Sequence, residues 1–223
     1  MAINEGAGAV VTASSDGTAK VWDARSGQVR MELRGASQPI KSVDMNGQIV
    51  VAASDDRTCS IWSMDTGRLR HTCRGHAGKI YSVRLASQGR IFTGSTDRSI
   101  KLWNTTDGRC TRTWSCTSTC NALAFEEAAG MLASAHQDGA VRLWDVRAQS
   151  ARPVAEVTTA HSAPVTSAMF DPCSGKQLLT NSRDNSLCLI DMRGSFEPVA
   201  SLRASGYTVP YNWSAACFSP DGQ

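Results

Sequence analysis

The sequence contains no run of about 18 consecutive apolar residues, the length that a membrane-spanning helix needs. Its first ten residues, MAINEGAGAV, lack the basic segment and the long apolar stretch of a secretory signal peptide. We therefore expect neither a membrane span nor a signal peptide. Aromatic side chains interleaved with basic ones, which stack on bases, are also missing, so we expect no nucleic acid as a partner.

The motifs of common catalytic and metal sites are missing as well. The sequence has no G-x-S-x-G, no Walker-type phosphate loop and no H-E-x-x-H. Its eight cysteines include no C-x-x-C pair, and no histidine lies at ligand spacing from the closest pair, Cys116 and Cys120. Scattered cysteines of this kind are typical of free thiols in an intracellular protein. We expect no enzyme activity, no metal and no cofactor.

What the sequence does contain is an aspartate six residues before each of five evenly spaced anchor residues. The anchors are Trp22, Trp62, Trp103, Trp144 and Ile190, and the aspartates are Asp16, Asp56, Asp97, Asp138 and Asp184. Consecutive anchors are 40, 41, 41 and 46 residues apart. A fixed period near forty indicates an array of structural repeats, which usually serves as a binding platform.

The segment 75–115 shows what one repeat is expected to form. Four short runs rich in β-forming residues follow one another, at 80–85, 90–94, 99–103 and 110–114. Turn sequences separate them, so the spacing predicts four antiparallel strands and no helix. Glycine lies five residues after three of the anchors, at Gly27, Gly67 and Gly108. A glycine there supplies the positive φ of a tight hairpin.

The repeats resemble the WD-repeat family over nearly the whole chain. The segment GHAGKIYSVRL…IFTGSTDRSIKLWN follows the family pattern, and the other copies are SSDGTAKVWD, SDDRTCSIWS, HQDGAVRLWD and SRDNSLCLID. The resemblance implies an all-β fold, a WD-repeat β-propeller with about five blades in this chain as part of a seven-bladed ring. Propellers close with about four to eight blades.

We expect one propeller domain over residues 1–223. The expected repeats are 1–34 (partial), 35–74, 75–115, 116–159, 160–204 and 205–223 (partial). The first repeat is expected to lack its first strand, because Val10 and Val11 already belong to a second one. The last is expected to begin with a strand at 213–219 and to continue into a turn at 220–222.

His76, Thr93, Asp97 and Trp103 offer the base, hydroxyl and carboxylate of a catalytic site. The family resemblance implies instead a structural tetrad, in which every buried polar group finds a hydrogen-bond partner. The other repeats carry only parts of this set. These parts are His161, Thr180 and Asp184 in the last complete repeat, and Ser134, Asp138 and Trp144 without a histidine in the fourth. The second repeat has Ala52 at the threonine position and no histidine.

Four stretches resemble, more narrowly, the C-terminal propeller of the autophagy-related protein 16 family. They are RLRHTCRGHAGK (68–79), STCNALAF (118–125), SRDNSLCLIDMRGS (182–195) and NWSAACFSPDG (212–222). This implies a non-enzymatic, cytoplasmic adaptor, recruited to autophagic membranes, that directs the lipidation of a ubiquitin-like modifier. Its implied partners are proteins. They are the autophagy conjugation machinery, bound by regions outside this chain, and peptides of receptors or membrane proteins, bound by the propeller, with indirect membrane association.

Repeat geometry predicts partner contacts at two positions of each repeat. One is the residue after the leading apolar residue of the first strand, and the other is the residue before the turn aspartate. These residues are Lys41, Asp55, Tyr81, Thr96, Asn121, Gln137, Thr166, Arg183 and Ser214. Tyr and Arg are favoured at interaction hot spots. The alternative is that each is only a solvated loop residue.

Six basic residues and no acidic one lie between Thr66 and Thr96. This run is either a solvated outer strand, whose charges deter edge pairing, or a docking face for an acidic partner or an anionic lipid surface. Two rival functions share the fold. One is a WD-repeat scaffold of another complex, such as a ubiquitin-ligase substrate receptor. The other is a phosphoinositide-binding propeller, whose FRRG motif has paired arginines where LRGA (33–36) and CRGH (73–76) have one each.

Overall fold

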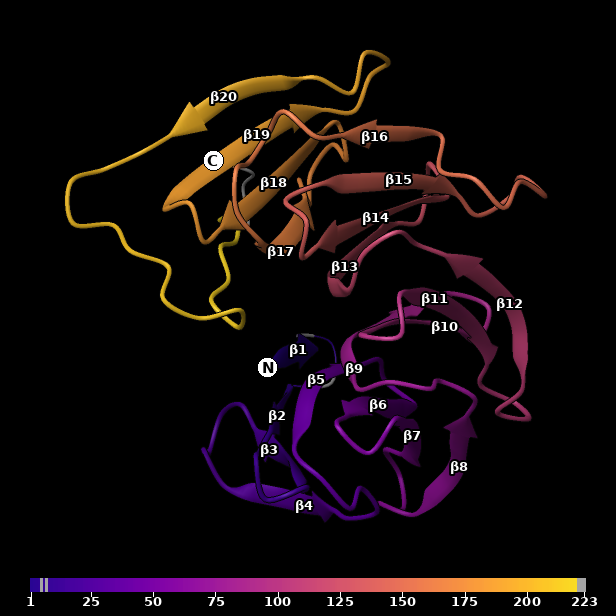
Figure 1. Cartoon of the computed structure of the whole chain (residues 1–223). Helices are drawn as coiled ribbons and strands as arrows, with labels where there is room; N and C mark the ends of the chain where they lie inside the picture. The colour runs from indigo at the N-terminus through magenta and orange to yellow at the C-terminus, as the bar shows by residue number, and fades with distance from the viewer. Residues whose placement is uncertain (5, 7, 220–223) are drawn as a thin grey trace. The chain divides into compact units, whose positions relative to one another are not determined.

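The computed structural model describes residues 1–4, 6 and 8–219, and every regular element in these residues is a β-strand. The strands form five four-stranded sheets in which neighbours in sequence are neighbours in space (Figure 1). The expected all-β class is confirmed, and each sheet is one blade of the expected β-propeller. The described residues contain no helix that is long and apolar enough to cross a membrane.

Each sheet is a meander of four consecutive strands. Sheet 1 consists of β1 (Ala2–Asn4), β2 (Ala9–Ala13), β3 (Ala19–Asp23) and β4 (Val29–Leu33). Sheet 2 consists of β5 (Ile40–Met45), β6 (Ile49–Ser54), β7 (Thr58–Ser63) and β8 (Leu69–Arg74). Sheet 3 consists of β9 (Ile80–Ala86), β10 (Arg90–Ser95), β11 (Ser99–Asn104) and β12 (Cys110–Ser115).

The remaining two sheets follow the same plan. Sheet 4 consists of β13 (Cys120–Glu126), β14 (Met131–His136), β15 (Val141–Asp145) and β16 (Ala155–Val157). Sheet 5 consists of β17 (Val165–Phe170), β18 (Gln177–Ser182), β19 (Ser186–Asp191) and β20 (Pro198–Leu202). The four strands predicted in segment 75–115 match β9 to β12 to within a residue or so at each end.

The chain divides into two compact units, residues 1–113 and 114–223, and the boundary falls within β12. Sheets 1 to 3 lie in the first unit apart from the end of β12, and sheets 4 and 5 lie in the second. The single domain expected over residues 1–223 and the seven-bladed ring stay predictions.

Two kinds of tight turn connect the strands. After the third strand, the predicted glycines Gly27, Gly67 and Gly108 adopt φ of 68°, 66° and 68°. Between the second and third strands, a non-glycine residue takes the left-handed conformation in three sheets: Arg57, Arg98 and Asn185, with φ of 70°, 63° and 62°. The turn aspartate holds this bend, since Asp97 Oδ1 accepts the backbone N–H of Ser99 over 2.9 Å.

The hydrophobic core lies between neighbouring sheets of each unit. In the first unit, one cluster of buried residues, which includes Val21 and Val50, joins sheets 1 and 2. A second cluster, which includes Ile61 and Ile91, joins sheets 2 and 3. In the second unit, a cluster around Leu143 joins sheets 4 and 5. Neighbouring repeats therefore bury each other's faces, as expected for stacked repeats.

The structure corrects two expectations about the first and last repeats. A first strand does precede Val10, because β1 pairs antiparallel with β2 and places Ile3 opposite Val10. Sheet 1 therefore has four strands. Residues 213–219 form no strand, so the first strand expected there is wrong. The turn expected at 220–222 lies outside the described residues.

Replacing Ile91 with alanine should lower the free energy of unfolding by about 2–5 kcal/mol, because it removes buried methylene groups and leaves a cavity. Ile91 in β10 is fully buried in the cluster between sheets 2 and 3. Denaturant titration followed by tryptophan fluorescence measures the change. Val29→Ala is the control, because Val29 in β4 is 45% exposed. Equal losses in the two variants would contradict a core at this position.

Candidate functional site

Four polar side chains of the third repeat form a continuous chain of hydrogen bonds. Trp103 Nε1 in β11 donates to Thr93 Oγ1 in β10 over 2.8 Å. Thr93 Oγ1 lies 2.7 Å from His76 Nε2, and His76 Nδ1 lies 2.7 Å from Asp97 Oδ2. The structure thus brings together all four residues of the expected tetrad. The tetrad ties the loop before β9 to the turn between β10 and β11.

One arrangement of protons satisfies every bond of the tetrad. The Trp103 indole only donates, so Thr93 Oγ1 accepts from it and donates its own proton to His76 Nε2. His76 then carries its proton on Nδ1 and donates it to the Asp97 carboxylate. Asp97 Oδ2 also accepts the backbone N–H of Ala77 over 2.9 Å, and Asp97 Oδ1 accepts the Ser99 hydroxyl over 2.6 Å.

The pKa shifts agree with a neutral histidine beside a charged carboxylate. Burial lowers the pKa of His76, and this effect outweighs the opposing influence of Asp97. Burial alone would raise the pKa of Asp97. Hydrogen bonds from Ser99, His76 and Ala77 together outweigh it and lower the pKa of this carboxyl below its usual value.

This geometry suits a structural role better than a catalytic one. Thr93 is fully buried, and its hydroxyl already accepts from Trp103 and bonds to His76. The His76 side chain has 0% of its surface exposed. A catalytic base must come within hydrogen-bond reach of its substrate, and the buried ring leaves no path for one. The tetrad is therefore best understood as an internal clamp between strands.

The fifth repeat forms the same chain without the tryptophan. His161 Nε2 lies 2.8 Å from Thr180 Oγ1, and His161 Nδ1 lies 3.3 Å from Asp184 Oδ2. Ile190 occupies the anchor position and is fully buried. Thr180 Oγ1 also lies 3.2 Å from the carbonyl oxygen of Cys188. The histidine network therefore forms without an indole donor.

The fourth repeat has no histidine in the loop before its first strand, as expected, but a histidine of its second strand bonds the buried hydroxyl instead. His136, the last residue of β14, places Nε2 2.8 Å from Ser134 Oγ, which also accepts from Trp144 Nε1 over 2.8 Å. His136 Nδ1 donates to the Ser118 carbonyl over 3.2 Å. The imidazole thus comes from the second strand instead of the preceding loop. The repeat pattern, which has its histidine before the first strand, therefore does not predict this residue.

The turn aspartate of the fourth repeat has a different partner. Arg142 is 4% exposed, and its Nη2 lies 2.8 Å from Asp138 Oδ2 and 2.5 Å from Glu156 Oε1. The sequence analysis did not identify this cluster. In β15, side chains two residues apart lie on the same face, so Arg142 lies on the face of the Trp144 anchor. This spacing is the sequence signal that could have predicted a buried arginine here.

The first repeat has no histidine, and the second has only His71, which lies on β8 and not in the loop before the first strand. Trp22 Nε1 donates to Thr12 Oγ1 over 2.8 Å in the first repeat. In the second, where Ala52 replaces the threonine, Trp62 Nε1 donates to the Arg34 carbonyl over 3.0 Å. Each anchor tryptophan therefore finds an acceptor even where the tetrad is incomplete.

Among the expected partner contacts of the first unit, Lys41 and Asp55 lie near each other. Lys41 Nζ is 3.8 Å from Asp55 Oδ2, and Lys79 Nζ is closer, at 3.1 Å. Tyr81 and Thr96 are partly buried. Lys79 is one of the six basic residues between Thr66 and Thr96 and stands directly before β9.

The expected contacts of the second unit differ in exposure. Asn121 and Thr166 are buried, at 6% and 5% exposed, which argues against both as partner contacts. Asn121 Nδ2 instead donates to Gln137 Oε1 over 3.2 Å. Gln137 and Arg183 are exposed, and Ser214 is partly buried. The pleat directs the two buried side chains into the protein, which the position rule did not take into account.

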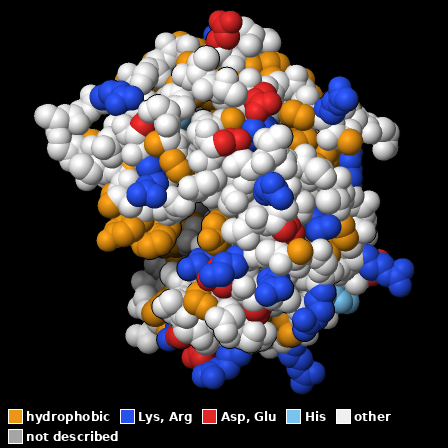
Figure 2. All heavy atoms as spheres, in the orientation of Figure 1, with side chains coloured by type: hydrophobic (Ala, Val, Ile, Leu, Met, Phe, Trp, Pro, Cys, Tyr) orange, Lys and Arg blue, Asp and Glu red, His pale blue; other side chains and the backbone are white. Residues whose placement is uncertain are grey.

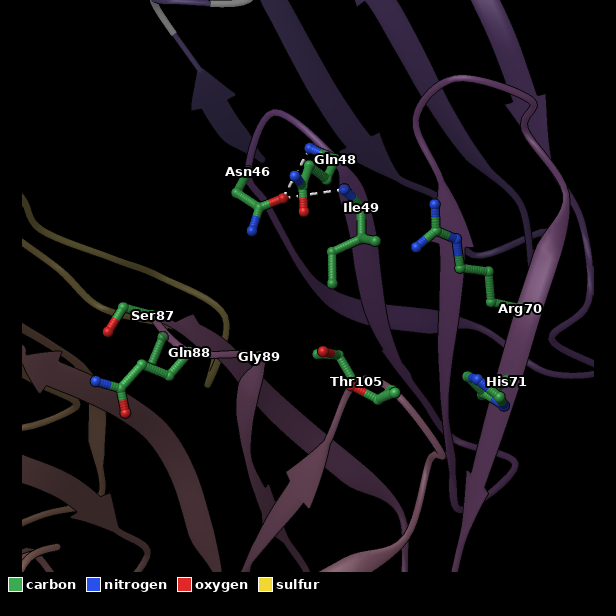
Figure 3. A pocket seen from close by; sticks show the side chains of 11 residues that line it. Asn46, Gln48, Ile49, Arg70, His71, Ser87, Gln88, Gly89 and Thr105 are labelled. Atoms are coloured by element: carbon green, nitrogen blue, oxygen red, sulfur yellow. Dashed lines mark hydrogen bonds between the residues drawn. The ribbon is translucent and has the colours of Figure 1, made fainter.

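The first unit also contains a polar pocket of about 490 Å³ that the sequence analysis missed. It is lined by the β5–β6 turn, β8, the β9–β10 turn and the β11–β12 turn (Figure 3). Its lining includes Gln48, Arg70, His71, Gln88 and Thr105, and it contains no aspartate or glutamate. Segments from two different repeats form this pocket, so no single motif predicts it.

Within residues 1–4, 6 and 8–219, no three His, Cys, Asp or Glu side chains are grouped closely enough to hold a metal ion. No disulfide links any two of the eight cysteines, all of which lie in these residues.

Comparison with known protein families identifies the same repeats that the fold shows. The family model described as "WD domain, G-beta repeat" matches residues 3–23, 27–63, 67–104 and 108–145, which is more than half of the chain. The chain belongs to this WD-repeat family. The family expected from the repeat pattern is therefore confirmed.

Three relatives show how far the similarity extends. The chain is 40% identical over 226 residues to Protein tipD of Dictyostelium discoideum, covering 100% of this chain and 36% of that protein. It is 36% identical over 221 residues to Autophagy-related protein 16 of Arabidopsis thaliana, covering 99% and 35%. It is 30% identical over 146 residues to DENN domain and WD repeat-containing protein SCD1 of Arabidopsis thaliana, covering 64% and 12%. The chain thus spans about a third of the length of the first two.

Replacing Asp97 with alanine should lower the free energy of unfolding by about 1–3 kcal/mol, because three donors, among them the buried His76 ring, lose their acceptor. These donors are His76, the N–H of Ala77 and the Ser99 hydroxyl. Thermal and urea unfolding measure the loss. Asp16→Ala is the matched control, since Asp16 takes the same turn position in sheet 1, is exposed and accepts from Thr18. An Asp97→Ala variant as stable as the parent would count against the tetrad as a clamp.

The free energy of unfolding should fall as the pH drops from neutral toward 4. Burial lowers the pKa of His136 to about 4, and it also lowers the pKa values of His76 and His161. Below the unfolded pKa near 6.5, the unfolded chain binds protons that the folded chain excludes, so acid favours unfolding. The titration of His136 alone should lower the free energy of unfolding by about 2 kcal/mol between pH 7.5 and pH 5.

Urea titrations at these two pH values test this dependence. His136→Gln keeps a hydrogen-bonding side chain but cannot titrate, so this variant should lose less stability on acidification. A parent chain and a variant with the same pH dependence would show that His136 is not held neutral.

Proposed function

We propose that this chain is the docking propeller of an autophagy-related protein 16-type adaptor. In this proposal, the whole protein directs the lipidation of a ubiquitin-like modifier to autophagic membranes, and the chain supplies a surface for partner proteins. The observation that carries the proposal is the 36% identity to Autophagy-related protein 16 of Arabidopsis thaliana over 99% of this chain. A protein that shared only the WD-repeat fold would match the repeat motifs but not the stretches between them. A match over nearly the whole chain therefore favours this particular family.

The geometry supports an interaction scaffold. WD-repeat sheets are rigid, with each anchor tryptophan hydrogen-bonded and the space between neighbouring sheets filled with apolar side chains. A rigid surface binds a partner at a low cost in conformational entropy. Because the tetrad is buried, partner contacts belong to the turns and outer strands, where exposed polar side chains gather. The proposed role is therefore non-enzymatic.

The proposed partners follow from this role. The conjugation machinery would bind regions outside this chain, and peptides of receptors or membrane proteins would bind the propeller. The proposed location is the cytoplasm, with recruitment to autophagic membranes through these partners and not through insertion into lipid.

Affinity purification with mass spectrometry tests the proposal on the full-length gene product, with and without residues 1–223. Both forms should recover the autophagy conjugation machinery, and only the complete form should recover membrane or receptor proteins. Recovery of a ubiquitin ligase or another stable complex in its place would overturn the autophagy assignment and leave the WD-repeat scaffold intact.

A further inference from the structure

Two arginines occupy the same structural position in sheets 1 and 2. In sheet 1, Met31 lies opposite Val21 and Val29 lies opposite Trp22, so Arg30 is the extra residue of a β-bulge. In sheet 2, His71 lies opposite Ile61 and Leu69 lies opposite Trp62, so Arg70 is the extra residue. A bulge redirects the side chain of its extra residue. Each bulge is on the outer strand of its sheet.

The two arginines differ in what neutralises them. Arg30 Nε donates to Asp23 Oδ2 over 3.0 Å, and Arg30 Nη2 pairs with the same oxygen. Asp23 directly follows the Trp22 anchor. In sheet 2 the residue after the anchor is Ser63, and Arg70 Nη2 donates to its hydroxyl over 3.0 Å. No carboxylate of the described residues forms an ion pair with Arg70, so its charge is not neutralised.

Ser63 also departs from the other four repeats. After the anchor they have Asp23, Asn104, Asp145 and Asp191, each accepting the backbone N–H two residues later over 2.8 to 2.9 Å. Within the described part of sheet 2, Ser63 makes no such bond. An aspartate there would hold the turn and neutralise Arg70. Ser63 does neither, so the Arg70 guanidinium can still pair with a carboxylate from another molecule.

The surroundings of Arg70 favour an anion. Arg70 lines the polar pocket of about 490 Å³, whose lining contains no acidic residue. Figure 3 shows its guanidinium directed toward the pocket, with Gln48 on the β5–β6 turn, Ile49 at the start of β6 and Thr105 across from it. Residues 1–113 contain 16 Lys and Arg against 10 Asp and Glu, a net charge of +6. Figure 2 shows many of these basic side chains at the surface.

We propose that this pocket binds an aspartate or glutamate side chain from an acidic peptide segment of a partner protein. The partner's carboxylate would take beside Arg70 the place that Asp23 takes beside Arg30. A guanidinium fork matches a carboxylate, and the Arg30–Asp23 pair shows that a carboxylate fits an arginine at this bulge. Gln48 and Gln88 also line the pocket, and their amides are able both to donate to and to accept from a peptide backbone. The inference rests on the proposed scaffold function, but not on its assignment to autophagy.

The volume of the pocket argues for a peptide over a free anion. A cavity of about 490 Å³ holds a side chain together with its flanking backbone. The lining amides and hydroxyls offer both donors and acceptors, which match the C=O and N–H groups of a peptide backbone.

The test is a titration of the ¹⁵N-labelled 223-residue chain, following the Nε–Hε signals of Arg70 and Arg30 by NMR. The probe is the peptide GSDEDSG, and its amide counterpart GSNQNSG is the control. The Arg70 signal should shift and saturate with the acidic peptide alone, while the Arg30 signal should stay unchanged. Equal shifts at the two arginines would indicate general charge attraction and overturn the site.

Two variants test whether the absence of an aspartate at position 63 leaves Arg70 able to bind the acidic peptide. Ser63→Asp should fold, because aspartate stands at this position in three other repeats, and it should neutralise Arg70. We expect affinity for the acidic peptide to fall roughly threefold to tenfold in Ser63→Asp and in Arg70→Gln. Arg30→Gln, the matched control, should bind as the parent does. Unchanged affinity in Ser63→Asp would contradict the proposal.

Two competitors identify the chemistry of the ligand. Inorganic phosphate and phosphatidylserine vesicles are added to the complex of chain and peptide. Weak competition by both supports a peptide carboxylate. Phosphate that saturates Arg70 at lower concentration than the peptide, or vesicles that displace it, would overturn the peptide in favour of a free anion or a membrane surface. These outcomes concern the isolated chain, so they are independent of what the full-length protein recovers from cells.

Discussion

A four-stranded sheet with apolar residues on both faces cannot bury them by itself, and this constraint governs the whole chain. Each sheet uses its neighbour as cover, so Ile61 in sheet 2 and Ile91 in sheet 3 belong to one buried cluster. Stacking in turn buries the polar ends of the strands, where hydroxyls and an indole would lose their contact with water. The hydrogen-bonded histidine networks satisfy those groups, since an unpartnered buried donor is costly.

The same requirement has been met in different ways along the chain. His76 reaches the buried hydroxyl from the loop before its sheet, whereas His136 reaches it from the end of the second strand. In sheet 2, Trp62 uses a backbone carbonyl instead. The fold therefore needs an acceptor for the indole and a partner for the hydroxyl, and tolerates several sources of each. This tolerance leaves turns and outer strands free to vary, and Ser63 is one place where the variation exposes a charge.

Local patterns predicted the fold well, because spacing and turn chemistry act within a few residues. The strands of the third repeat and the turns at Gly27, Gly67 and Gly108 follow directly from them. The site was less predictable. The polar pocket combines turns of two repeats, His136 bonds the carbonyl of Ser118, which lies 18 positions earlier in the chain, and the pleat buries Asn121 and Thr166. The strand β1 was missed because three residues show no clear alternation.

We infer that partner proteins dock on an exposed surface of the first unit of this chain. The most direct test places a photo-crosslinking amino acid at Gln48, in the polar pocket, within the full-length protein in cells. The same amino acid at Ser26, an exposed turn residue of sheet 1, is the control. The account predicts a crosslink from position 48 to a protein through an acidic segment, weakened by Ser63→Asp. Equal crosslinking from both positions, or none from position 48, would contradict it.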